Sequence, residues 1–194
     1  MNLSSLFLIL LFCGLTLAQD TVETDAMTEK FNSLETKMMN IESKLENYES
    51  RILQLEQKER NAVIFSAGIG VDSPFGPFNT DITMIYDTVL VNIGNAYSPV
   101  TGIFTAPVSG VYFFTIFSHA GGRHETWLHL YKNNEVILHI HDHPSTDPAD
   151  NGGNAAFLQL QQGDTVYVRL KANTHVYKAR TVTTFSGFLV KQNS

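Results

Sequence analysis

Cysteine is nearly absent from this chain, with Cys13 the only one among 194 residues. A disulfide-stapled scaffold and a cysteine-rich zinc module both need several cysteines and are therefore excluded. Basic residues number 13 against 19 acidic ones, and the net charge of −6 argues against a nucleic-acid partner, which would need a basic surface. Charged residues make up only 16% of the chain and aromatics 11%, so extensive disorder is excluded as well.

No apolar run is long enough to span a membrane. The stretch Leu6–Leu17 has about 12 residues, whereas a spanning helix needs about 20. Residues 1–18 carry no charged side chain and end in Thr16-Leu17-Ala18, with small residues where signal peptidase cuts. We predict that 1–18 are a signal peptide, with a buried helix as the alternative, and that the protein is secreted. Cys13 then leaves with the peptide, so packing alone holds the mature chain together.

Glycine and proline are missing from residues 19–60, while the remainder holds all six prolines and 12 of the 13 glycines. Within 19–60 apolar side chains recur every seven residues. Position a holds Phe31, Met38, Leu45 and Ile52, and position d holds Met27, Leu34, Ile41, Tyr48 and Leu55. This alternation over about four heptads predicts a coiled-coil stalk that joins a second domain, 61–194, near residue 60.

The charges that flank this stripe predict parallel helices. The g positions are basic and the e positions acidic, namely Lys30, Lys37, Lys44 and Arg51 against Glu35, Glu42, Glu49 and Glu56. In a parallel assembly each g side chain meets the partner's e side chain five residues further on, whereas antiparallel pairing brings like charges together. Each exposed pair contributes only about 0.2–1 kcal/mol, but four attractive pairs against repulsive ones fix the direction. The a and d residues do not choose between two and three strands.

Residues 61–194 predict an all-β domain. Alternating apolar and polar residues recur between turn-forming segments such as Gly121-Gly122 and Gln162-Gly163-Asp164. Many short strands of this kind indicate a sandwich or a barrel. The expected strands are Ala62–Ala67, Thr83–Val91, Gly102–Thr105, Val111–His119, Thr126–Tyr131, Val136–His141, Asn154–Leu160, Thr165–Lys171 and Thr181–Val190.

The identities and spacing of aromatic, asparagine and glycine residues along this domain resemble the signature of the globular head of complement C1q. The matching positions are Tyr86, Asn92, Tyr97, Phe104, Gly110, Tyr112 and Phe114, followed by Gly163-Asp164 and the closing Phe185-Ser186-Gly187-Phe188. Two positions depart from the pattern. Tyr86 stands where the family has Phe, and Ile116 stands where it has an aromatic residue, for which the neighbouring Phe117 is expected to compensate.

The resemblance implies a ten-stranded jelly-roll sandwich that assembles as a compact trimer, as in tumour-necrosis-factor-like proteins. A coiled coil here replaces the collagen stalk of C1q, a form similar to short secreted C1q-domain proteins. We therefore expect a secreted homotrimer that binds microbial or host surface glycans in innate immunity. A signalling ligand for a cell-surface receptor, cerebellin- or adipokine-like, and an extracellular matrix component are the alternatives.

Enzymatic motifs are absent from the sequence, which has no Gly-x-Ser-x-Gly elbow and no phosphate-binding loop. The segment from His124-Glu125 to His129 is one residue longer than a zincin motif, and we interpret it as accidental. The protein is therefore not expected to be an enzyme.

Carboxylates between residues 141 and 150 suggest a calcium site, because Ca²⁺ prefers oxygen ligands on loops. The resemblance implies the same: counting back from the Gly163-Asp164 turn places the family's calcium-binding pair at Asp150 and Asp142. Asp147 is a weaker third candidate. An acidic solvated loop without a metal is the alternative.

Two further groups are candidate sites. His139, His141 and His143 alternate on one face of an expected strand and could bind a transition metal or respond to pH, or could be an exposed strand face. A small basic patch for anionic sugars could form from Lys178 and Arg180 with Arg169 and Lys171 on a neighbouring strand. Exposed polar strands are the alternative for this second group.

Overall fold

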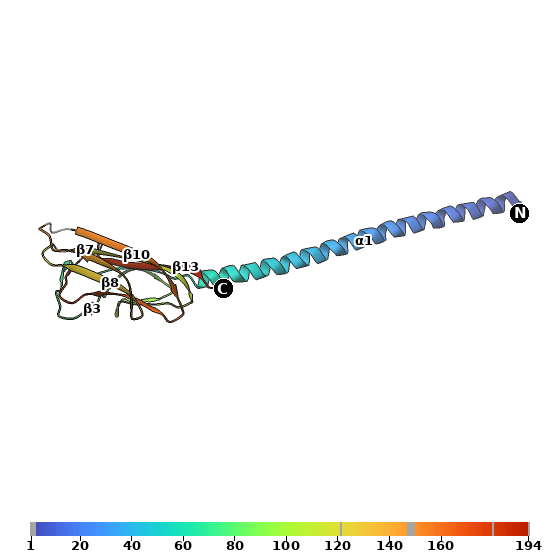
Figure 1. The fold of residues 1–194 in the computed structure, drawn as a ribbon. Helices are drawn as coiled ribbons and strands as arrows, with labels where there is room; N and C mark the ends of the chain where they lie inside the picture. Colours follow the sequence, from blue (N-terminus) through green and yellow to red (C-terminus); the bar gives the residue numbers. More distant parts are fainter. Residues whose placement is uncertain (1–2, 121, 147–149, 180, 194) are drawn as a thin grey trace. The chain divides into compact units, whose positions relative to one another are not determined.

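The computed structural model describes residues 3–120, 122–146, 150–179 and 181–193. The chain divides into two units, Met1–Gln57 and Lys58–Ser194. In the described residues one helix is followed by thirteen strands (Figure 1).

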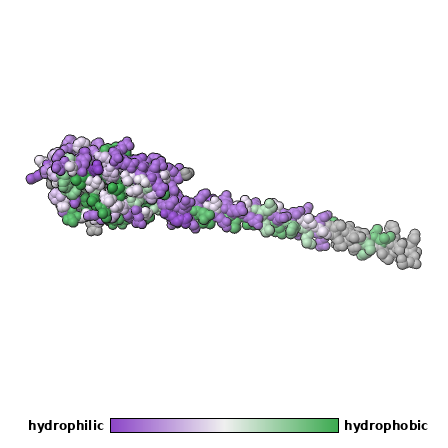
Figure 2. Space-filling model, turned by 90° about the horizontal axis from the view of Figure 1, so that it is seen from below, coloured by the Kyte–Doolittle hydropathy of each residue, from purple (hydrophilic) through white to green (hydrophobic). Residues whose placement is uncertain are grey.

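The first unit is a single helix, α1, which runs from Leu3 to Arg60. All nine a and d side chains of the heptad stripe are exposed to between 54% and 67%, so one chain alone buries none of them. Apolar and polar side chains share the surface of the described helix (Figure 2). Across the residues that the structure describes, no helix is both long and apolar enough to cross a membrane. The helix continues through residue 18, and cleavage there stays a prediction.

The second unit is a sandwich of two antiparallel sheets, which confirms the expected fold. One sheet has seven strands in the order β2 (Ser73–Phe75), β12 (Val176–Lys178), β7 (Gly110–Ala120), β13 (Thr184–Gln192), β1 (Ile64–Gly68) and β4 (Thr88–Ile93), with β10 (Asp150–Leu160) also paired to β7. The other has six, in the order β5 (Tyr97–Ser98), β6 (Ile103–Thr105), β11 (Thr165–Leu170), β8 (Thr126–Lys132) and β9 (Glu135–Asp142), with β3 (Ile82–Thr83) also paired to β11.

The strands differ from the expected ones at a few places. The expected strand Thr83–Val91 is two strands, β3 and β4, and Met84 and Tyr86 between them are fully buried. The short strands β2, β5 and β12 were not expected from the sequence, since segments of two or three residues show no periodicity. With these short strands included, the domain has thirteen strands among the described residues, whereas the resemblance implied a ten-stranded jelly roll.

Aromatic side chains fill the space between the sheets. The Phe65 ring packs on those of Tyr97, Phe104 and Phe185, with centroids 4.9, 5.3 and 4.8 Å away. Full burial of one such side chain stabilises the fold by about 1.5–3 kcal/mol. Ile116 lies in this core with no exposed surface, but Phe117 is 50% exposed on the other face of β7. The expectation that Phe117 compensates for Ile116 is therefore wrong, because adjacent strand residues point in opposite directions.

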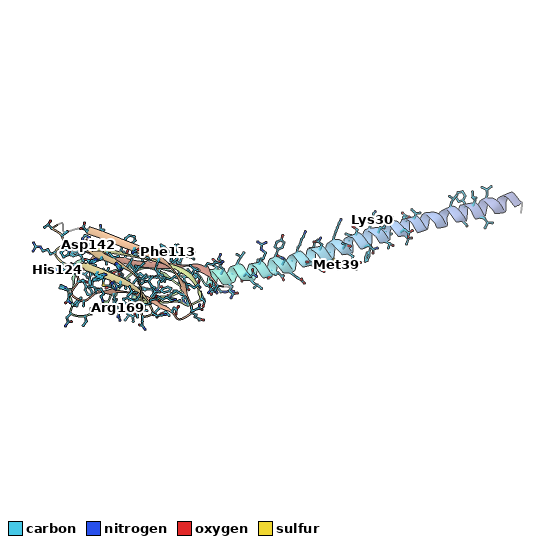
Figure 3. All side chains as sticks on the ribbon, in the orientation of Figure 1. Lys30, Met39, Phe113, His124, Asp142 and Arg169 are labelled. Carbon is cyan, nitrogen blue, oxygen red and sulfur yellow. The ribbon has the colours of Figure 1, made fainter. Side chains whose placement is uncertain are left out.

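Strands β9 and β10 belong to different sheets but lie side by side, and the Asn154 amide donates a hydrogen bond to the His139 carbonyl at 3.1 Å. This contact brings the end of β9 close to the beginning of β10. Asp142 and His124 lie at the same end of the sandwich (Figure 3). Asp142 and His143, two of the candidate ligands, therefore lie near the loop that carries His124.

Candidate functional site

The outer face of the seven-stranded sheet carries exposed aromatic side chains. Phe113 on β7 pairs directly with Phe157 on β10 and with Phe188 on β13. Their ring centroids lie 4.8 and 5.6 Å from that of Phe113. Phe157 is 66% exposed and Phe188 42% exposed, so these rings cover one another only in part. An aromatic cluster that one chain leaves uncovered is typical of a protein contact surface.

Asp142 and Asp150 come together as the calcium hypothesis requires. Asp142 ends β9 and Asp150 begins β10, and both line a cavity of about 170 Å³. Backbone and polar side chains of Ser118 and Asn151 border the same cavity. The third candidate, Asp147, lies outside the described residues. The structure thus places two oxygen-ligand side chains beside one small space, and calcium binding stays a prediction.

The three candidate histidines do not form one group. The rings of His141 and His143 are 4.6 Å apart, whereas His139 packs beside His129 at 5.9 Å and Trp127 at 6.4 Å. His143 lies beyond the end of β9, which stops at Asp142. The side chain that joins His141 and His143 is Glu125, whose Oε1 lies 2.5 Å from His141 Nε2. Sequence spacing could not reveal Glu125, because it comes from the segment before β8.

The three basic candidates that the structure describes do not form the expected patch. Lys178 lies on β12, which pairs with β2 and β7. Arg169 lies on β11 in the other sheet, and Lys171 follows the last residue of that strand. The expectation that these strands are neighbours is therefore wrong, because the chain crosses between sheets after β11. Arg180 lies outside the described residues.

Each of the three described basic side chains has a local partner. Lys178 Nζ lies 4.2 Å above the Phe75 ring, and the Arg169 guanidinium lies 5.5 Å from the rings of both Tyr131 and Tyr167. Lys171 Nζ donates to the Asp81 carboxylate at 2.6 Å. A cation that already contacts an aromatic ring or a carboxylate of the protein interacts less strongly with an added anion.

A different cationic cavity, of about 550 Å³, lies near Lys178. Its lining comes from β2, β7, β12 and the loops beside β8, and consists of Pro74, Gly76, His119, Arg123, His124, His175 and Tyr177. Sequence analysis missed this site because its residues are spread over about a hundred positions. Only the pairing of Tyr177 with His119, and of Pro74 with Tyr177, brings them together.

The polar groups of this cavity are held in place. His119 Nδ1 is hydrogen-bonded to the Asn151 side chain at 2.8 Å, and its ring meets Tyr177 edge-on at 5.5 Å. The His175 backbone N–H donates to the Glu125 carbonyl at 2.8 Å, while its Nδ1 is buried without a hydrogen-bond partner among the described residues. Burial, followed by the nearby His124, lowers the pKa of His175. Arg123 is exposed and lines the cavity, where its guanidinium offers several N–H donors.

The two antiparallel sheets of the second unit place it in the jelly-roll class of domains. The C1q domain family matches residues 64–190, and the chain belongs to this family. It is 33% identical over 114 residues to complement C1q tumor necrosis factor-related protein 3 of Mus musculus, and 33% identical over 108 residues to the collagen alpha-1(X) chain of that species.

The chain spans less than half of the length of these two relatives. The matches span 58% and 54% of this chain but only 46% and 16% of the two relatives. Among solved structures, the globular domain of zebrafish complement 1qA protein aligns with 68% of this chain and 99% of its own, at a TM-score of 0.54 and 24% identity. Murine APRIL covers 66% of this chain at a TM-score of 0.51 and 12% identity, with 99% of its own chain aligned. These structural likenesses show the fold.

Proposed function

We propose that this protein is a secreted homotrimer whose heads recognise anionic glycans on microbial or host surfaces. The observation that carries the proposal is the cavity lined by Arg123, His124 and Tyr177. A guanidinium can bind a carboxylate or sulfate with two parallel hydrogen bonds. A tyrosine ring beside it offers a flat apolar surface to the face of a sugar.

Trimer formation supports recognition through multivalency. The exposed aromatic cluster around Phe113 and the exposed heptad stripe of α1 each give identical chains a surface to bury. Parallel helices of identical chains would bring basic g and acidic e side chains of different chains together, which favours assembly with copies of the same chain. Three linked heads would add weak contacts to repeated sugars through a high effective concentration.

The test is binding of the purified full-length secreted protein to a glycan array and to whole microbes. Arg123→Gln removes the fixed charge of the cavity, and we expect it to lose binding to sulfated and carboxylated sugars. Lys191→Gln removes the same charge from an exposed position on β13 and is the matched control. A protein that binds no glycan, yet binds host cells saturably, would overturn the proposal in favour of a receptor ligand.

A further inference from the structure

Glu125, His141 and His143 form a compact group at the end of the sandwich. One ligand atom from each side chain can be chosen so that all three lie within 4.8 Å of one another. His141 Nε2 and Glu125 Oε1 are 2.5 Å apart, and the rings of His141 and His143 are 4.6 Å apart. Among the described residues this is the one group of three such side chains within that reach.

The fold fixes the segments that carry this group. Residue 141 on β9 pairs with Trp127 on β8, and the two rings lie 4.8 Å apart. The Ser145 N–H donates to the Gly122 carbonyl at 2.6 Å, which ties the segment after His143 to the one before Glu125. The Glu125 carbonyl in turn accepts from the His175 N–H at 2.8 Å. Backbone hydrogen bonds thus hold the three segments together, in addition to the contact between His141 and Glu125.

We propose that Glu125, His141 and His143 bind a divalent transition-metal ion of the Zn²⁺ class. Two imidazole nitrogens and one carboxylate oxygen are ligands that Zn²⁺ accepts, whereas Ca²⁺ takes oxygen ligands only. Imidazole also favours transition metals over Mg²⁺ and Ca²⁺. The group is therefore chemically distinct from the neighbouring Asp142 and Asp150, which offer oxygen alone.

Side-chain rotation is enough to bring the three ligand atoms from their present separations to those of a metal site. Bonds of about 2.0–2.2 Å in a tetrahedral site separate ligand atoms by about 3.4 Å. His141 and His143 are exposed and Glu125 is half-buried, so their side chains can rotate without disturbing the core. Three protein ligands leave a fourth position for water or for an oxygen of a bound molecule. The metal would join the segment before β8 to the end of β9.

This inference goes beyond the proposed glycan recognition and does not depend on it. His139 provides an internal control because it lies on the same strand, is exposed, and packs beside His129 and Trp127 instead. Replacing it removes one imidazole from β9 and leaves the three proposed ligands intact.

Isothermal titration of the metal-free full-length protein with Zn²⁺ tests the site. We expect one ion per chain, with affinity lowered at least about tenfold in Glu125→Gln, His141→Gln and His143→Gln and unchanged in His139→Gln. Titration with Co²⁺ should give the visible absorption of a low-coordinate site in the parent protein and in His139→Gln, and not in His141→Gln. Circular dichroism of each metal-free variant checks that it is folded.

Equal affinity in the parent protein and in folded His141→Gln and His143→Gln would overturn the proposal. So would a loss in His139→Gln as large as that in His141→Gln, because the binding imidazoles would then be elsewhere on the surface. If one ligand variant fails to fold, the other two still decide the outcome.

Discussion

The hydroxyl of Tyr97 binds both backbone groups of Tyr86. It accepts a hydrogen bond from the Tyr86 N–H at 3.1 Å and donates one to the Tyr86 carbonyl at 3.0 Å. Both residues are buried, and burial raises the pKa of the Tyr97 hydroxyl. This side chain thus replaces the ladder partners that residue 86 lacks between β3 and β4.

Tyr97→Phe should destabilise the head by about 1–3 kcal/mol, because it leaves a buried N–H and a buried C=O without this partner. The measurement is denaturant unfolding at a fixed protein concentration, since dissociation of an oligomer contributes to stability. Tyr131→Phe is the control, because the ring there stacks on Tyr167 at 5.4 Å and Phe keeps that contact. Equal effects of the two substitutions would contradict the role assigned to the Tyr97 hydroxyl.

The heptad stripe of α1 predicts that lysine substitutions disrupt assembly at a and d positions but not elsewhere on the helix. Ile41→Lys together with Leu45→Lys places two cations in consecutive core layers and should dissociate the stalk, while the heads stay trimeric through their own faces. Adding Phe157→Lys should then give monomers in light scattering. Met39→Lys is the control, because Met39 is also apolar and 66% exposed but lies outside the a and d positions (Figure 3). A parent protein that is monomeric or dimeric at micromolar concentration would disprove the trimer.

Acid stability should depend on Asp81. Its carboxylate accepts from Lys171 Nζ at 2.6 Å and from the Ala172 N–H at 2.9 Å. The bond from Lys171 is the largest cause that holds the pKa of Asp81 below its ordinary 3.8. A pKa lowered by folding gives stability that is present above the unfolded-state pKa and is lost as pH falls through the folded-state pKa.

Asp81→Asn should therefore lower the free energy of unfolding by about 1 kcal/mol at neutral pH, and the difference from the parent should shrink below pH 3.8. Urea unfolding at a series of pH values measures this. Asp72→Asn changes an exposed carboxylate and should leave the curve in place. A difference that stays constant down to pH 2 would argue against the ionic origin.

Calcium should stabilise the head if Asp142 and Asp150 bind it. A ligand that binds only the folded protein raises its stability by RT ln(1 + [L]/Kd). Millimolar Ca²⁺ should raise the thermal midpoint, chelation should lower it, and Asp150→Asn should remove most of the difference. Asp72→Asn should retain it. Coincident melting curves with calcium and with chelator would show that these carboxylates bind no calcium and belong to a solvated acidic loop.

Sequence periodicity determined the two kinds of structure in this protein. A strict seven-residue repeat without glycine or proline specifies a helix with one apolar stripe, and α1 has that stripe exposed along its length. Period-two alternation specified long strands such as β7, where Tyr112, Phe114 and Ile116 face the core. These patterns are local, since they depend only on the direction in which each side chain leaves the backbone.

Tertiary structure alone decided which polar residues meet. The resemblance to the C1q head paired Asp142 with Asp150, and both line one cavity, but the grouping of Glu125 with His141 depends on the pairing of β8 with β9. Arg123, His175 and Tyr177 likewise share a cavity through contacts between distant segments. Likewise, Lys178 and Arg169, nine positions apart, lie in different sheets. Spacing along a strand fixes the face of a side chain, whereas its neighbours across the sheet are fixed by long-range hydrogen bonding that no local pattern encodes.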